Sequence, residues 1–127
     1  MKKDKKLTKK VIYKILDWCV VNYGRSEFNK NKLIVDFRKP DYLTGDVMAS
    51  YDYETGIIYV NKETHKTLRM LINSIIHEYT HYKQNMRHYN ILDTYLAYNK
   101  NPLEIEAFKI AKRDTKRCID EIKDSLK

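Results

Sequence analysis

Apolar residues near the start of the chain recur every three or four positions, which is the spacing of one face of an α-helix. Thr8 is a suitable N-cap residue for this helix, and Gly24 supplies a stop signal at its end. We therefore expect a first helix between Thr8 and Gly24. Its apolar face is formed by Val11, Ile12, Ile15, Leu16, Cys19, Val20 and Tyr23.

The pattern changes to short β-rich runs between residues 32 and 61. Residues 32–37 read KLIVDF and are followed by Pro40. Residues 47–53 and 56–61 flank a short connection that contains Gly56, an arrangement typical of a β-hairpin. The sequence therefore predicts three strands, of which the last two pair as a hairpin.

Helical spacing returns after the hairpin. Residues 64–87 carry an apolar stripe that predicts one continuous helix, and residues 91–98 form a shorter helical candidate. Asn101 suits an N-cap and Pro102 a first helical position, so a last helix should begin there and run to the C-terminus. One helix, three strands and then helices predict an α+β fold with segregated elements.

Length and composition indicate one globular domain, which we place at residues 7–127 behind a basic, disordered tail of residues 1–6. No apolar run approaches the roughly 18 residues that a membrane span needs. The lysine-rich start lacks both an unbroken apolar segment and a cleavage site, so we expect a cytoplasmic protein. Cys19 and Cys118 lie on apolar helix faces and are expected to be buried thiols.

Positive charge is concentrated in the first third of the chain. Residues 1–39 contain 12 Lys and Arg against 4 Asp and Glu, whereas residues 40–127 contain 13 of each kind. Such a segment could bind nucleic acid or an acidic partner through residues 2–39. A solvated lysine-rich surface is the plainer interpretation, because no recognised nucleic-acid motif accompanies the charge.

The most informative segment is LINSIIHEYTHYKQ, residues 71–84. His77 and His81 lie four positions apart, so on a helix both imidazoles share one face and can bind the same ion. Zn²⁺ accepts imidazole ligands in tetrahedral sites and can leave one position open for water. Glu78 follows His77 at about 100° around the helix and could act as general base toward that water. Partly exposed histidines paired with carboxylates are the alternative interpretation, although burying these polar groups without a purpose would be costly.

A hydrolytic zinc site needs a third protein ligand, for which Glu104 is the best candidate. Ala107 and Ala111 share its helix face and would allow close packing against the histidine helix. Glu104 is also the third helical residue after Asn101, and a glutamate at that position can cap the helix without binding any metal. Glu106 and His88 are alternative ligands, and His65 is a more distant one.

With these residues assembled, the chain resembles gluzincin-type zinc metallopeptidases over roughly residues 57–111. The resemblance rests on the hairpin ending IIYVN, on HEYTHYKQ and on NPLEIEA, in which EIEA matches the family's ligand motif with Glu104 in the ligand position. HEYTHYKQ is also similar to SprT-like and phage-encoded small metallopeptidases. Many gluzincins place Asp or Asn where this chain has Phe108, so we expect its histidines to be supported differently.

The resemblance implies a minimal zincin-like domain and a zinc-dependent peptidase, with zinc on His77, His81 and Glu104. It also implies that a peptide substrate pairs with an exposed edge strand, here residues 47–53. An oxyanion donor is expected from the segment before Glu104, where Tyr95 and Tyr98 are the candidates. The alternative function is a binding module that keeps the metal as a structural staple and uses its basic first third on nucleic acid or an acidic partner.

Overall fold

The computed structural model describes residues 8–37, 48–61 and 64–126, without the side chains of residues 88, 90 and 93–95. The predicted disordered tail, residues 1–6, and Val47 of the predicted edge strand lie outside these ranges. So do the side chains of two candidate residues, His88 and Tyr95.

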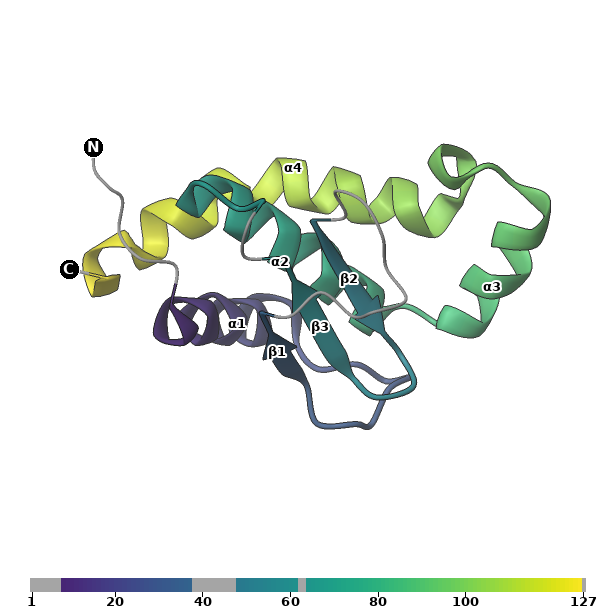
Figure 1. The fold of residues 1–127 in the computed structure, drawn as a ribbon, viewed down its shortest axis with the longest axis horizontal. Helices are drawn as coiled ribbons and strands as arrows, with labels where there is room; N and C mark the ends of the chain where they lie inside the picture. Colours follow the sequence, from purple (N-terminus) through teal and green to yellow (C-terminus); the bar gives the residue numbers. More distant parts are fainter. Residues whose placement is uncertain (1–7, 38–47, 62–63, 127) are drawn as a thin grey trace.

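Helices and a small sheet follow one another in the order that the sequence predicts (Figure 1). The helices are α1 (Lys9–Tyr23), α2 (Leu68–Lys83), α3 (Met86–Tyr95) and α4 (Pro102–Ile122), and the strands are β1 (Ile34–Asp36), β2 (Ala49–Asp52) and β3 (Ile57–Val60). Short 3-10 helices at Tyr98–Lys100 and Lys123–Leu126 precede and follow α4. The predicted α+β class is confirmed.

Local signals place both ends of α1 and the start of α4 where the sequence predicts them, whereas α4 ends at Ile122 and not at the C-terminus. The Thr8 side chain accepts a hydrogen bond from the Val11 N–H, and Gly24 ends α1 with a positive φ of 78°. Glycine tolerates that backbone conformation because it has no Cβ. At α4, the Asn101 side chain accepts from the Leu103 N–H and Pro102 takes the first helical position.

Within the described residues the sheet has the strand order β1-β3-β2. β1 runs parallel to β3, whereas β2 pairs with β3 in antiparallel fashion and places Tyr51 opposite Ile58. The hairpin prediction is confirmed. β2 therefore lies at an edge of the described sheet.

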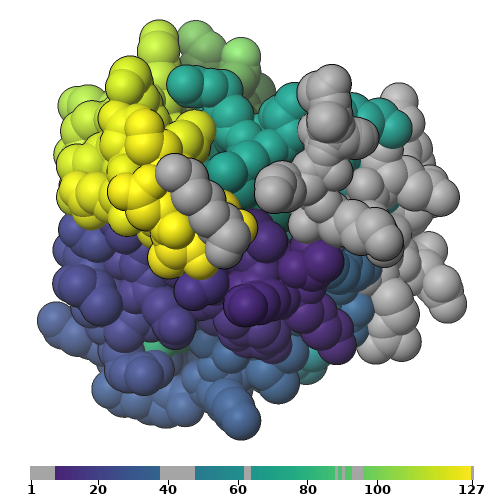
Figure 2. Space-filling view, turned by 90° about the vertical axis from the view of Figure 1, so that its left-hand side faces the viewer, coloured from purple at the N-terminus to yellow at the C-terminus, as the bar shows by residue number. Residues whose placement is uncertain are grey.

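Helix α2 is the central element of the core, since it packs against α1, α4 and the strands β2 and β3. Figure 1 shows α2 between the sheet and α4, with α1 beside the sheet. The core combines the apolar faces of these elements with both cysteines, which are fully buried free thiols as predicted. At the end of the molecule away from α3, α1 lies against the C-terminal part of α4 (Figure 2).

The prediction of one helix over residues 64–87 is wrong at both ends. α2 begins only after Thr67, whose side chain caps it, and ends at Lys83. The Asn85 side chain then accepts a hydrogen bond from the Arg87 N–H and starts α3. An Asn N-cap inside a polar run ends one helix and begins another, so the chain turns at Gln84. The predicted short helix at 91–98 is correspondingly α3, which ends at Tyr95.

None of the helices in the described part of the chain combines the length and apolar character that crossing a membrane requires.

Candidate metal centre

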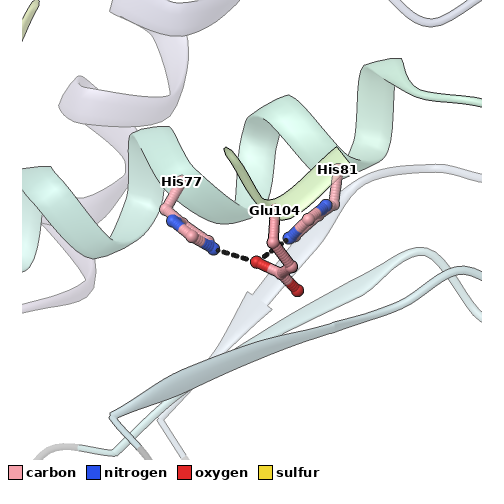
Figure 3. Close-up of side chains that lie close together, drawn as sticks. All are labelled: His77, His81 and Glu104. Atoms are coloured by element: carbon pink, nitrogen blue, oxygen red, sulfur yellow. Dashed lines mark hydrogen bonds and ion pairs between the residues drawn. The ribbon is translucent and has the colours of Figure 1, made fainter. Parts of the chain in front are cut away.

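His77 and His81 lie one turn apart on α2, and Glu104 lies in the first turn of α4 directly opposite them (Figure 3). One potential ligand atom from each residue lies within 4.8 Å of the other two. All three residues are buried, with exposed fractions of 7%, 4% and 4%. Two helices thus bring two imidazoles and a carboxylate to one point, although Glu104 lies 23 positions after His81 in the sequence.

Small side chains let α4 come this close to α2. Ala107 is fully buried and Ala111 is only 1% exposed, so both sit in the contact between the helices. These alanines follow Glu104 at i+3 and i+7, on the same face of α4. The packing that buries them therefore also turns the Glu104 carboxylate toward the histidines, as the sequence predicts.

Glu104 does not cap its helix. The Asn101 N–H, which a capping glutamate would bind, donates instead to the Tyr98 carbonyl. Oε1 of Glu104 lies 2.9 Å from Nε2 of His77 and 3.1 Å from Nε2 of His81. Oε2 accepts a hydrogen bond of 2.6 Å from the Tyr89 hydroxyl. The capping alternative is therefore wrong, because tertiary packing gives this carboxylate stronger partners.

The structure places two of the other candidate ligands, Glu106 and His65, away from this cluster. Glu106 accepts a hydrogen bond of 2.7 Å from the Gln84 amide and is not in the cluster. The two ring nitrogens of His65 contact the Asn61 carbonyl and the Ser74 hydroxyl, both at 2.8 Å. Among the described side chains, the group able to hold a metal is His77, His81 and Glu104.

The charges of the cluster depend on one another. Burial alone would raise the pKa of Glu104, but the hydrogen bonds from His77, His81 and Tyr89 hold that pKa far below its usual range. Burial alone would lower the pKa of His81, but the Glu104 hydrogen bond and the Glu78 charge raise it. The pKa of Glu78 is raised by burial, against the opposing influence of His81 and His77. Glu104 therefore carries a negative charge that faces both imidazoles.

Two residues that the sequence analysis did not select, Gln84 and Tyr89, support the ligands. Oε1 of Gln84 lies 2.7 Å from Nδ1 of His81, and Tyr89 binds Glu104. Phe108 packs its ring against His77 in a T-shaped contact with 4.4 Å between ring centroids. The described supports of the two histidines are thus the Gln84 amide and the Phe108 ring. A signal for Gln84 was present in its i+3 spacing from His81, a distance at which helical side chains meet.

A cavity of about 570 Å³ opens beside the cluster. It reaches from α2 and α4 to the edge strand, and its lining includes Glu78, Tyr98, Phe108, Met48 and Ser50. The Ser50 Oγ is buried and is without a hydrogen-bond partner in the described part of the chain. A molecule in this cavity would therefore meet the candidate ligands, Glu78 and a free hydroxyl together.

Tyr95 and Tyr98 are the two predicted oxyanion donors, and the structure describes the side chain of Tyr98. It lines the cavity, is 53% exposed, and stacks edge-on against Phe108 with 6.2 Å between ring centroids. Burial and the nearby Glu104 carboxylate raise the pKa of Tyr98, so its hydroxyl keeps its proton at neutral pH. Part of this shift comes from a hydrogen bond to Glu104, so a molecule in the cavity would compete with that carboxylate for the Tyr98 proton.

The donor set of the cluster suits a metal ion. Two imidazole nitrogens and one carboxylate oxygen are the ligands of His₂Glu zinc sites, which leave a fourth position open. Ligand atoms about 2.0–2.2 Å from such an ion lie roughly 3.3 Å apart, close to the separations between Glu104 and the two histidines. The chain can therefore hold a metal ion at this point. Comparison with protein-family models, with curated proteins and with solved structures found no significant match.

Proposed function

We propose that the chain is a minimal zincin-like, zinc-dependent peptidase, with the metal on His77, His81 and Glu104. The observation that carries this proposal is the position of Glu78, which lines the same cavity as the three candidate ligands without belonging to their cluster. A binding module that uses a metal only as a structural staple has no need of a buried carboxylate beside it.

Zinc bound here would act as a Lewis acid toward the scissile carbonyl and would lower the pKa of a water molecule. Glu78 would accept a proton from the attacking water and then pass it to the nitrogen of the departing amine. The raised pKa of Glu78 suits both roles, because a base with a pKa nearer neutrality also returns the proton readily. Tyr98 would donate a hydrogen bond to the negative charge that develops on the carbonyl oxygen.

The lining of the cavity also favours a peptide over other classes of substrate. The cavity is lined by residues 48–51, which include most of β2, and β2 pairs only with β3 in the described part of the sheet. A peptide in extended conformation could add to such an edge through main-chain hydrogen bonds. The unpartnered Ser50 hydroxyl provides a further polar contact in the same segment.

The proposal is tested by metal analysis and hydrolysis assays on the same preparations. We expect about one zinc per chain, and cleavage of a denatured protein substrate that is lost when the metal is chelated. Glu78→Gln should retain zinc while losing hydrolysis by a factor of at least about 10². Hydrolysis that survives in metal-loaded Glu78→Gln, or a folded protein that cannot be loaded with zinc, would overturn the proposal.

A further inference from the structure

Gln84 lies where α2 ends, and it connects the metal cluster to α4. Its side chain is buried, with an exposed fraction of 8%. Its amide oxygen lies 2.7 Å from Nδ1 of His81. Its amide nitrogen donates to the Leu103 carbonyl at 2.9 Å and to Oε1 of Glu106 at 2.7 Å. One side chain thus contacts a candidate ligand and the first turn of the helix that carries another.

These partners determine which way the Gln84 amide points. A carbonyl oxygen and a carboxylate oxygen accept hydrogen bonds and cannot donate them, so both must face the NH₂ group. The amide oxygen must then face Nδ1 of His81, and that nitrogen must carry a hydrogen. In neutral His81 the lone pair is therefore on Nε2, the atom that faces Glu104 at 3.1 Å.

We infer that Gln84 is a positioning residue of the metal centre, which selects the His81 tautomer and fixes the ring, and that Glu106 holds Gln84 in place. Nε2 of His81 and the Glu104 oxygen share a proton in the metal-free protein, and a metal ion that replaces this proton would meet an electron pair on each side. The inference rests on the metal-binding part of the proposed function and not on hydrolysis. It also gives Glu106 a role, as the anchor of the residue that orients a ligand.

The two histidines are held by different contacts, so the inference applies to His81 and not to His77. His77 packs against the Phe108 ring, whereas His81 has the Gln84 hydrogen bond. The His81 ring also contacts Tyr89 edge-on, with 5.6 Å between centroids, but that contact does not distinguish one ring nitrogen from the other. Without Gln84, His81 should therefore populate both tautomers, whereas His77 should stay in place.

Gln84→Met tests this, because methionine has a similar length but no amide. We expect its zinc affinity, measured by competition with a chelator, to fall about 10- to 100-fold. The visible absorption of the cobalt-loaded protein should change, since the His81 ring is no longer fixed. NMR of histidine labelled with ¹⁵N, at an alkaline pH where His81 is neutral, should show the Nδ1–H tautomer of His81 in the wild type and a mixture in Gln84→Met.

Variants of Glu106 test the hydrogen bond between Glu106 and Gln84 without removing the one between Gln84 and His81. Glu106→Gln still offers an oxygen to the Gln84 amide and should keep nearly the wild-type affinity. Glu106→Leu removes that oxygen and should produce a loss smaller than that of Gln84→Met, because the Leu103 carbonyl still binds Gln84. If Gln84→Met does not fold, the difference between these two Glu106 variants decides the question.

Thr115→Val is the matched control for a purely structural effect. Thr115 accepts a hydrogen bond of 3.3 Å from Asn73 and so also connects α4 to α2, but it contacts none of the candidate ligands. We expect this variant to lose stability without losing zinc affinity. The inference is overturned if Gln84→Met behaves the same way, with wild-type zinc affinity and cobalt absorption. A wild-type protein that binds no metal would contradict the proposed function, and the His81 tautomers in the two proteins would still test the inference.

Discussion

The Tyr89 hydroxyl donates a hydrogen bond of 2.6 Å to Oε2 of Glu104, while Oε1 of the same carboxylate faces His77 and His81. The carboxylate is thereby held with a single oxygen toward the imidazoles. Tyr89 reaches it because the chain breaks at Gln84 and begins α3. A continuous helix through residue 87 would have carried Tyr89 along the axis of α2 and away from Glu104.

Replacing Tyr89 by Phe should weaken zinc binding about tenfold, because the carboxylate loses the bond that orients it. Chelator competition measures this change. Tyr13→Phe is the matched control, since Tyr13 lies on α1, outside the lining of the metal cavity. Equal zinc affinities for wild type and Tyr89→Phe would show that the hydroxyl does not contribute to the site.

Glu104 and Glu106 should respond differently to the same substitution. Glu104→Gln replaces the carboxylate that faces both histidines and should lower zinc affinity by about 100-fold or more, beyond the usual effect of a supporting residue. Glu106→Gln should retain most of the affinity. Isothermal titration of both variants with zinc makes the comparison. The opposite order of affinities would assign the third ligand to Glu106.

Zinc should stabilise the folded chain, because the three candidate ligands come together only after α4 packs against α2. At a free zinc concentration a thousandfold above the Kd, the gain in the free energy of unfolding should be about 4 kcal/mol. Thermal unfolding with and without chelator measures it. His81→Ala should remove the response to zinc, and a Tm unaffected by zinc in the wild type would contradict the prediction.

The charge of Asp114 should make the free energy of unfolding depend on pH in the acid range. The hydrogen bond from Arg113 lowers the pKa of its carboxyl against the opposing effect of burial, and Tyr23 of α1 donates to the same carboxyl at 2.6 Å. A pKa lowered in the folded state gives stability that is present above the unfolded value of about 3.9 and is lost as pH falls through the folded pKa. Asp114→Asn should therefore cost about 1–3 kcal/mol at pH 7, and this difference should shrink as pH falls below about 3.9 toward pH 2.

Urea unfolding of wild type and Asp114→Asn at the two pH values measures this difference. Asp120→Asn is the control, since Asp120 is an exposed residue in an ion pair with Lys116. Its effect should be small, as for exposed pairs in general. A stability difference between wild type and Asp114→Asn that stays constant down to pH 2 would contradict the prediction.

Removal of residues 1–7 should leave zinc affinity unchanged, because the site is built from α2, α3 and α4. The truncated chain retains Thr8, which caps α1. Binding of both proteins to duplex DNA at low and moderate salt tests the alternative function. Salt-sensitive DNA binding that disappears on truncation, in a protein without peptidase activity, would favour a nucleic-acid-binding module over the peptidase.

Much of the local structure could be predicted from the sequence. Thr8, Gly24, Asn101 and Pro102 mark the ends of α1 and the start of α4 through hydrogen bonds and backbone preferences that involve only near neighbours. The end of α2 was missed. The apolar period continues to Met86, and only the Asn85 cap, a weak local signal, shows that the helix stops.

The sequence alone determined that His77 and His81 share one face of a helix, because helical geometry brings residues four apart together wherever the helix lies. It also restricted the third ligand to a few residues. Only the tertiary structure places Glu104, and not Glu106, beside the two histidines, because these glutamates differ by about 200° around α4 and the burial of Ala107 and Ala111 sets which one faces α2. The same packing made Glu106 the partner of Gln84 and brought Tyr89 to Glu104. Contacts between distant segments depend on how the helices dock, and the spacing of residues along one helix does not encode that docking.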